Sequence, residues 1–381
     1  MSDRPEFFAG APLHNPWLYR RAPFHMGDPM ALMTLPGDGV YAILRDIELD
    51  RFRQSGIADH SFAPAEYAPA SGLSGDRETA TAQAAAELLV RQGIREIWTD
   101  RSCPMIFAHE IEARGVQVHC DPELGVLERR AKTEEEVEHL RAAQSITENA
   151  VRFACELIAN ATADADGRLA HEGDALTSER VMAEINIWLL RHGMGTSGSI
   201  VAGGADGADC HNRGSGPLRT GELIIIDVFP MHLASRYFGD CTRTVVHGEA
   251  PRDAIEMHAA VIAAKAASIQ ATRAGVTGEA VHKAATDVIE SSGYALGLPS
   301  PADSNPGATM PHGTGHGVGL EVHEPPLLDT GGPALVRGDC LTIEPGLYKV
   351  GFGGVRVEDM VIVTDDGCEN LNSISEGLYW R

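Results

Sequence analysis

The sequence contains few basic residues for its length. Its 381 residues include 31 Lys and Arg against 54 Asp and Glu, and its formal net charge is −23. A protein that binds DNA or RNA regardless of sequence, or an anionic membrane surface, needs a basic face to neutralise phosphates. The charge balance therefore argues against nucleic acid and membranes as partners.

Long apolar runs are also missing. A membrane-spanning helix requires about 20 consecutive apolar residues, whereas the run at residues 223–229 is short and is interrupted by Asp227. The N-terminal residues MSDRPEFFAG contain no basic segment that leads into an apolar stretch, so no secretory signal is visible. We therefore expect a cytoplasmic protein.

Paired cysteines and several familiar catalytic motifs are absent. The seven cysteines are odd in number and widely scattered, with no CxxC pair, which is typical of reduced thiols. The sequence contains neither the HExxH pattern of zinc proteases nor a GxSxG nucleophile elbow. The glycine-rich segment at residues 313–319 does not match the dinucleotide pattern GxGxxG, because Val318 stands where the third glycine would fall.

The length of the chain suggests two domains, and the composition changes near Lys132. Before that residue, short apolar runs alternate with helical patterns, which is typical of an α/β domain. Thr133 and Glu136 form a capping box, and apolar residues then recur at helical spacing as far as Ile158. We expect a smaller α/β domain at residues 1–131, followed by a second domain at residues 132–381 that begins with a long helix.

The second domain contains both helix and strand patterns. The sequence predicts further helices at residues 178–191, 253–272 and 278–291, and strands at residues 199–202, 223–229, 237–246, 340–343 and 355–363. Because strands stand before and after a pair of helices, we assign this domain to the α+β class.

Five acidic or imidazole side chains interrupt the apolar or glycine-rich segments of this domain. They are Asp227, Asp240, His316, Glu344 and Glu358. A buried carboxylate is costly unless a cation compensates it. The arginines closest in sequence, Arg243 and Arg356, are too few for four carboxylates that face one another. Two divalent metal ions would supply +4 against −4, so the pattern predicts a paired-metal centre.

The donor types narrow the choice of metal. Oxygen-rich ligation with a single imidazole suits Mn²⁺ best, accommodates Co²⁺, Fe²⁺ or Zn²⁺, and disfavours a thiolate-type structural zinc site. Paired-metal hydrolases hold their ions about 3.5–4 Å apart and polarise the scissile bond. We therefore expect a hydrolytic centre.

Histidines and glycines are concentrated in the segment PHGTGHGVGLEVHEPP. It contains His312, His316 and His323, and its glycines let backbone and substrate approach closely. A further histidine, His211, lies in the glycine-rich segment AGGADGADCHNRGSG, just before the strand that carries Asp227. A lone histidine of this kind is more often structural than functional, but the set as a whole favours a site.

The chain resembles the metallopeptidase family of methionine aminopeptidase, aminopeptidase P and prolidase, which also contains creatinase. The resemblance rests on the order of the five residues above, on TRT after Asp240 and on GHGVGLEVHE around the histidines. It covers residues 132–381 and implies a pita-bread domain, in which two pseudo-symmetric halves close over a dinuclear metal site. Residues 1–131 resemble in general character the N-terminal domain of creatinase, prolidase and aminopeptidase P, which favours the Xaa-Pro peptidase branch over methionine aminopeptidase.

The resemblance also implies a role for each site residue. The five residues Asp227, Asp240, His316, Glu344 and Glu358 would be the metal ligands. Glu344 would also shuttle the proton of a metal-bridging hydroxide. His211 and His323 would contact substrate and steady the tetrahedral intermediate, while His312 and Arg356 would lie behind the ligands. The implied reaction is the attack of hydroxide on the carbonyl before proline in a short proline-containing peptide.

Several alternatives stay open. Dipeptidases of the family often place an arginine shortly after the second histidine motif, where this sequence has Leu327 and Leu328, so both a dipeptidase and a longer-peptide aminopeptidase are retained. A non-peptide amidohydrolase or lyase acting on a small metabolite, or a non-catalytic binding scaffold, would use the same fold. Relatives are commonly homodimers or higher homo-oligomers, which we also expect here. Cys210 and Cys241 adjoin site residues; either thiol could be sensitive to oxidation, but we expect both to be small buried fillers.

Overall fold

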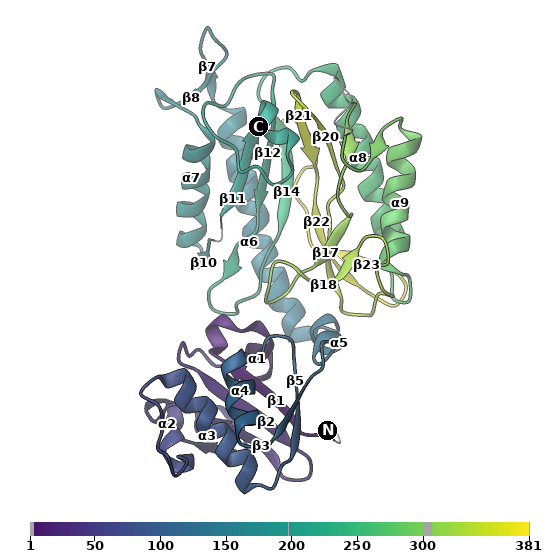
Figure 1. Ribbon diagram of the computed structural model, residues 1–381. Coiled ribbons are helices and arrows are strands. Elements are labelled where there is room, and N and C mark those ends of the chain that lie inside the picture. Colours follow the sequence, from purple (N-terminus) through teal and green to yellow (C-terminus); the bar gives the residue numbers. More distant parts are fainter. Residues whose placement is uncertain (1–3, 197, 300–306, 381) are drawn as a thin grey trace. The chain divides into compact units, whose positions relative to one another are not determined.

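The computed structural model describes residues 4–196, 198–299 and 307–380 (Figure 1). The chain forms two compact units, Met1–Arg129 and Arg130–Arg381. A short helix, α5 (Val126–Arg130), spans the division between them. Among the described helices, none has both the length and the apolar character needed to cross a membrane.

A six-stranded mixed sheet forms the centre of the first unit. Its strand order is β4-β3-β2-β1-β5-β6, in which β1, β2 and β3 pair antiparallel while β5 and β6 run parallel to β1. The strands are β1 (Glu6–Gly10), β2 (Met30–Leu35), β3 (Gly39–Ile43), β4 (His60–Phe62), β5 (Glu96–Thr99) and β6 (Gln117–Cys120).

Two separate cores lie on the two faces of this sheet. Successive side chains of a strand point to opposite faces, so the adjacent Phe7 and Phe8 of β1 enter different cores. Phe7 packs with α3 (Arg77–Arg91) and α4 (Met105–Ala113), and Phe8 packs with α1 (Pro16–Arg21) and α2 (Leu49–Ser55). Short 3₁₀ helices occur at η1 (Pro12–His14), η2 (Asp46–Glu48) and η3 (Pro64–Tyr67).

The second unit begins with a long helix, α6 (Glu134–Ala159). The Thr133 hydroxyl accepts from the Glu136 N–H, and the Glu136 carboxylate accepts from the Thr133 N–H, so the predicted capping box is confirmed. α6 and α7 (Ser178–Arg191) pack their apolar faces on a three-stranded antiparallel sheet. This sheet contains β11 (Ser199–Gly203), β12 (Leu223–Val228) and β14 (Cys241–Val246). We call residues 130–251 the first half.

The first half also contains short strands and a 3₁₀ helix. β7 (Thr162–Ala163), β8 (Leu169–His171) and β9 (Asp174–Ala175) form a small sheet, and β10 (Met194–Gly195) pairs with β13 (Met231–His232). The 3₁₀ helix η4 (Gly204–Ala208) follows β11.

We call residues 252–381 the second half, and its described residues, 252–299 and 307–380, form two helices and two sheets (Figure 1). α8 (Arg252–Ala271) and α9 (Gly278–Ser291) pack on both sheets through two apolar clusters. One sheet has the order β15-β16-β20-β21: Ala295–Leu296, Thr309–Met310, Gly346–Lys349 and Gly353–Arg356. The other has the order β18-β17-β19-β22-β23: Glu324–Leu328, Gly315–Gly317, Cys340–Ile343, Asp359–Val363 and Cys368–Asn370. This segregation of helices from sheets confirms the α+β class.

Two strand predictions were wrong. β14 begins only at Cys241, so Asp240 lies directly before the strand. Residues 355–363 are divided between β21 and β22, which belong to different sheets. Every residue from Gly353 to Val363 is buried, so the apolar pattern carried no sign of the break. Glu358 therefore lies where the chain passes from one sheet to the other.

Candidate active site

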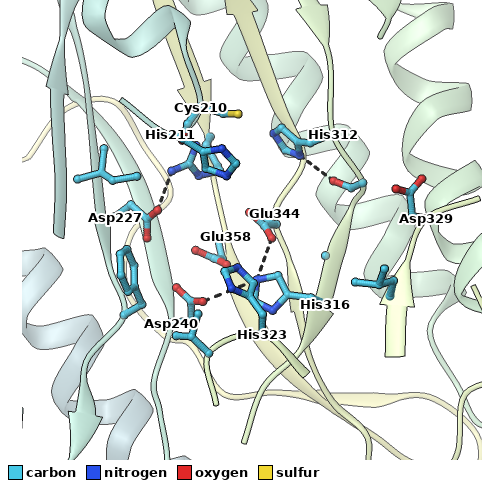
Figure 2. Close-up of a pocket in the computed structure, with 17 residues that line it drawn as sticks. Cys210, His211, Asp227, Asp240, His312, His316, His323, Asp329, Glu344 and Glu358 are labelled. Atoms are coloured by element: carbon cyan, nitrogen blue, oxygen red, sulfur yellow. Dashed lines mark hydrogen bonds and ion pairs between the residues drawn. The ribbon is translucent and has the colours of Figure 1, made fainter. Parts of the chain in front are cut away.

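A cavity of about 290 Å³ lies in the second unit (Figure 2). It is lined by every residue that the sequence singled out for metal binding or catalysis: His211, Asp227, Asp240, His312, His316, His323, Glu344, Arg356 and Glu358. These residues come from both halves of the unit, so the fold brings together side chains that are far apart in the sequence.

The five predicted ligands lie on strands or directly next to strand ends, two in the first half and three in the second. Asp227 lies on β12 and Asp240 directly before β14, both in the first half. In the second half, His316 lies on β17, Glu344 directly follows β19, and Glu358 separates β21 from β22. Asp227 pairs across the sheet with Thr242, two residues beyond Asp240. Because side chains alternate along a strand, this two-residue offset keeps both aspartates on the same side.

Three of these residues form a compact donor cluster. One donor atom each from Asp240, His316 and Glu358 lie within 4.8 Å of one another, and all three residues are buried. His316 Nε2 lies 3.9 Å from Asp240 Oδ2 and 3.3 Å from Glu344 Oε1. Its Nδ1 lies 3.1 Å from the Gly317 carbonyl oxygen and donates to it. Burial lowers the pKa of His316, but the hydrogen bond and charge of Glu344 outweigh it and raise the pKa. Nε2 therefore donates to Glu344 when protonated, and it would serve as a ligand once a metal ion replaces that proton.

Asp227 contains an oxygen without a partner. Its Oδ2 accepts from Arg356 Nη2 over 2.7 Å, whereas its buried Oδ1 has no hydrogen-bond partner in the described part of the chain. A buried acceptor without a partner is costly, and such a group calls for a water molecule or an ion. The free oxygen of Asp227 and the neighbouring donor cluster therefore fit a divalent cation.

Burial shapes the pKa values of the acidic side chains. It raises the pKa of Asp240 and of Glu358 well above the ordinary carboxyl value, and the charge of neighbouring carboxylates adds to this rise. Burial also raises the pKa of Asp227, against the opposing charge of Arg356. Burial acts in the same direction on Glu344, but the hydrogen bond and charge of His316 outweigh it and lower the Glu344 pKa to about 2. The four carboxylates thus need added positive charge before they all ionise together, which divalent cations would supply.

Polar contacts fix the backbone and carboxylates of the cluster. Gln144 on α6 is fully buried, and its amide accepts from the Asp240 N–H over 2.8 Å and donates to the Asp240 carbonyl over 2.7 Å. Gly239 permits this close approach, because a Cβ at that position would lie 3.0 Å from Gln144 Oε1 and 2.2 Å from Thr147 Oγ1. Thr242 donates to Glu358 Oε2 over 2.7 Å. Gln144 therefore fixes the backbone of Asp240, and Thr242 orients the carboxylate of Glu358.

A chain of hydrogen bonds runs behind the cluster. Arg356 Nη1 donates to the Tyr348 hydroxyl over 2.8 Å, and that hydroxyl lies 2.9 Å from His312 Nε2. His312 Nδ1 lies 2.7 Å from the Gly313 carbonyl oxygen. This network assigns the proton of His312 to Nδ1 and lets Tyr348 donate to Nε2. Burial lowers the pKa of His312, consistent with a neutral ring.

His323 lies on the turn before β18, next to a buried ion pair. Its ring centroid lies 4.3 Å from that of His316. Although His323 is exposed at the cavity surface, partial burial of its imidazole lowers the pKa. The following residue, Glu324, accepts from Lys132 Nζ over 2.6 Å, and both side chains are at most 2% exposed. Lys132 therefore fixes the backbone immediately after His323.

His211 lies on the loop after η4 and is exposed at the cavity. Asp206 Oδ2 accepts from the Ser215 N–H over 3.0 Å and closes this loop. Cys210 also lines the cavity and is half-buried, and burial raises the pKa of its thiol. Cys241 is fully buried.

A comparison with protein families identifies the second unit. Residues 138–365 match the model of Metallopeptidase family M24. The chain belongs to this family. The match confirms the resemblance found in the sequence, and the five predicted ligands all lie within the matched residues.

Curated relatives and solved structures agree with the M24 assignment. The chain is 38% identical to "Probable dipeptidase PepE" of Mycobacterium tuberculosis over 181 residues, which is 47% of this chain and 45% of that protein. It is 30% identical to the Xaa-Pro dipeptidase of Pyrococcus furiosus over 254 residues, which is 66% of this chain and 65% of that protein. The chain thus spans about half to two thirds of the length of these relatives.

Among solved structures, the prolidase from Pyrococcus horikoshii superposes with a TM-score of 0.77 at 21% identity, covering 98% of this chain and 95% of that chain. The Xaa-Pro dipeptidase from Bacillus anthracis gives a TM-score of 0.79 at 21% identity, with 99% and 95% covered. At this identity the likeness shows the fold, and it confirms the pita-bread architecture expected from the sequence.

Sequence reasoning missed three residues that support the M24 site: Gln144, Tyr348 and Lys132. Gln144 lies on a helix face where a buried polar residue has no periodic mark, and Tyr348 looks like an ordinary strand residue. Thr242 lies in the TRT segment that carries the family resemblance, but its contact with Glu358 was not predicted. The sequence offers no local sign of these contacts, because each of them joins residues that are far apart along the chain.

Proposed function

We propose that this chain is a dinuclear-metal peptidase that hydrolyses the bond between an N-terminal residue and proline. The observation that carries the proposal is the convergence of Asp240, His316 and Glu358 within 4.8 Å in a cavity that also contains the three other histidines and Glu344. The names of the relatives, Xaa-Pro dipeptidase and prolidase, support the specificity. We propose short proline-containing peptides as substrates and a homodimer or higher homo-oligomer as the assembly.

The donor set suits two hard divalent cations, Mn²⁺ above all, with Co²⁺, Fe²⁺ or Zn²⁺ as substitutes. Asp227, Asp240, His316, Glu344 and Glu358 would hold them. When bound, these cations would polarise the scissile carbonyl and supply a hydroxide nucleophile at neutral pH.

The remaining chemistry falls to side chains of the chain itself. Glu344 is half-buried at the cavity wall, and the neighbouring cations would keep it ionised. It can then take a proton from the attacking water and deliver it to the proline nitrogen that leaves. His323 is neutral at pH 7 because its pKa is lowered, and its N–H can donate to the carbonyl oxygen as negative charge develops. His211, exposed on the same cavity, would assist from the other half. His312 and Arg356 orient Tyr348 and Asp227 from behind.

The test combines metal content with a peptide panel. The purified chain is stripped with EDTA, refilled with Mn²⁺ and assayed on Gly-Pro and Gly-Pro-Pro, with Gly-Ala and Gly-Ala-Ala as matched controls. We expect two metal ions per chain and cleavage of at least one proline peptide. If neither proline peptide is cleaved, the proposed Xaa-Pro specificity is wrong. Less than one metal ion per chain would indicate a non-catalytic binding scaffold.

A further inference from the structure

An acidic side chain that belongs to neither the ligand set nor the histidine set stands at the opening of the cavity. Asp329 lines the cavity directly after β18, and its side chain is 49% exposed. In Figure 2 it lies on the side of the cavity opposite to Asp227. The Thr330 N–H donates to Asp329 Oδ1 over 2.7 Å, and Gly313 packs so closely that a Cβ on it would lie 3.2 Å from Asp329 Cβ and Cγ. Asp329 is therefore held in place and directed at the solvent side of the cavity.

The cavity contains no cation that could balance a carboxylate at this opening. Among the described residues that line it, Arg356 is the only lysine or arginine, and its side chain is 4% exposed and bound to Asp227 and Tyr348. The His282 imidazole lies beside Asp329, with its Nε2 3.6 Å from Asp329 Oδ1. The opening thus presents negative charge to whatever passes through it.

The part of a peptide that passes this opening follows from the proposed function. An enzyme that removes one N-terminal residue has a single residue on the amino side of the scissile bond. The rest of the bound peptide, beginning with proline, would extend from the scissile bond towards solvent. The exposed residues of the described cavity wall are His211, His323 and Leu327, and the half-exposed side chain of Asp329 lies on the same wall.

A second hollow, of about 370 Å³, continues from His323 and Leu327 along a proline-rich wall. Pro325, Pro326 and Pro333 belong to that wall, and Leu327 is 58% exposed. A peptide that extends beyond proline can therefore follow an apolar path out of the cavity. A dipeptide bound in the proposed way would instead end at the opening, and its terminal carboxylate would face Asp329 and Leu327.

We propose that Asp329 selects substrates by charge. It disfavours a free carboxylate on the proline and favours a cationic residue after it, so the preferred substrates are Xaa-Pro-Lys or Xaa-Pro-Arg peptides and not Xaa-Pro dipeptides. This inference rests on the proposed function and names a substrate class within it. An exposed charge pair changes binding by a small factor, so each step in charge should change kcat/KM about three- to fivefold.

The experiment compares peptides that differ in charge at one place. The Mn²⁺-loaded full chain is assayed at about pH 8 with Gly-Pro, Gly-Pro-NH₂ and the series Gly-Pro-Lys-NH₂, Gly-Pro-Gln-NH₂ and Gly-Pro-Glu-NH₂. The expected order of kcat/KM in the series is Lys, Gln, Glu, and the amide Gly-Pro-NH₂ should exceed Gly-Pro. In Asp329→Asn, the kcat/KM values of the three peptides should agree within about twofold. In Asp329→Lys, their order should be reversed. Asp287→Asn is the matched control, because Asp287 is an exposed acid on α9 outside the cavity.

The outcomes separate the two proposals. Cleavage of the Gln peptide without a charge order, or an order that Asp329→Asn leaves unchanged, would overturn the role of Asp329 alone. An order that the Asp287→Asn control also abolishes would assign the effect to overall charge and overturn it too. If the wild-type chain cleaves none of the proline peptides, the proposed function fails and this inference fails with it. An unchanged melting temperature shows that each variant is folded.

Discussion

The Arg356 guanidinium donates through Nη2 to Asp227 Oδ2 across 2.7 Å. Arg356 ends β21 in the second half, whereas Asp227 lies on β12 in the first half, and both side chains are buried. This ion pair therefore joins the two halves directly behind the donor cluster. It also occupies one oxygen of Asp227 and leaves the other, Oδ1, for a cation.

Replacement of Arg356 should damage both stability and activity. Arg356→Gln leaves the Asp227 carboxylate buried without its partner, and breaking such a pair costs about 3–5 kcal/mol of unfolding free energy. We expect kcat/KM to fall at least about 100-fold, since a misplaced ligand of this kind costs that much. Arg356→Lys should recover part of the stability but little of the activity, because an ammonium group cannot reach Asp227 and Tyr348 in the same planar arrangement. Urea unfolding measures the loss of stability and steady-state kinetics the loss of activity, with Arg252→Gln at an exposed arginine as the control. Full activity in Arg356→Gln would contradict the role of this ion pair in the active site.

The Lys132–Glu324 pair should control the position of His323. Lys132→Met removes the partner of a buried carboxylate next to His323, so we expect kcat to fall more than about tenfold while the metal content stays unchanged. The double variant Lys132→Met, Glu324→Gln carries no unpaired charge and should recover much of the lost stability. A double-mutant cycle on kcat and on unfolding free energy checks this coupling. Lys283→Met, which removes an exposed lysine from α9, serves as control. Additive effects of the two substitutions would show that the pair does not position the turn.

Removal of the metal should lower stability, and single ligand substitutions should lower metal content. A cation that binds only the folded chain adds about 2.7 kcal/mol of stability when its free concentration is 100 times its Kd. Asp240→Asn and Glu358→Gln should each reduce the metal ions per chain, since both residues belong to the donor cluster. His323→Ala is the matched control in the same cavity, and it should keep the metal while losing activity. Elemental analysis and thermal unfolding with and without EDTA give the readouts. Unchanged metal content in both ligand variants would remove these residues from the ligand set.

His258 on α8 should contribute to the pH dependence of folding, away from the active site. Its Nε2 lies 2.7 Å from the Glu376 carbonyl oxygen, and burial lowers its pKa below the ordinary 6.5. Because the pKa of His258 is lower in the folded chain than in the unfolded chain, folding favours the neutral ring. The contribution of His258 to the free energy of unfolding is therefore complete above its pKa in the unfolded chain, and it declines as the pH falls below that value. Between pH 7 and 5, His258→Gln should therefore show a shallower loss of unfolding free energy than the wild type, by at most about 1.4 kcal/mol per pH unit. Urea titrations at several pH values test this, with the exposed His109→Gln as control; parallel pH curves for wild type and His258→Gln would refute it.

The parts of the fold with a clear periodic pattern could be predicted from the sequence. The helices at residues 178–191 and 278–291 and the strand at residues 340–343 lie where the pattern placed them. The site could be predicted in the same way, because a charged residue in an apolar strand stands out against its neighbours. The five predicted ligands stood out in this way, whereas the other four site residues were assigned through the family resemblance, and all nine line one cavity.

The contacts that hold those residues could not be predicted. Gln144 and Asp240 are 96 positions apart, and Tyr348 and His312 are 36 positions apart, so no local pattern connects them. The break between β21 and β22 was missed because burial on both sides of Glu358 hides it. The domain limits 1–131 and 132–381, the individual roles of the site residues, the oligomeric state and the cytoplasmic location stay predictions.

The donor cluster is drawn from both halves, and this has a consequence for how the molecule can move. Asp240 belongs to the first half, whereas His316 and Glu358 belong to the second, so any hinge motion that parts the halves would pull the donors away from one another. We therefore expect a peptide to enter without such opening, past the exposed residues His211 and His323 of the cavity wall. Adaptation to different peptides would then depend on these exposed residues, while the spacing of the donors would be set by how the two halves pack.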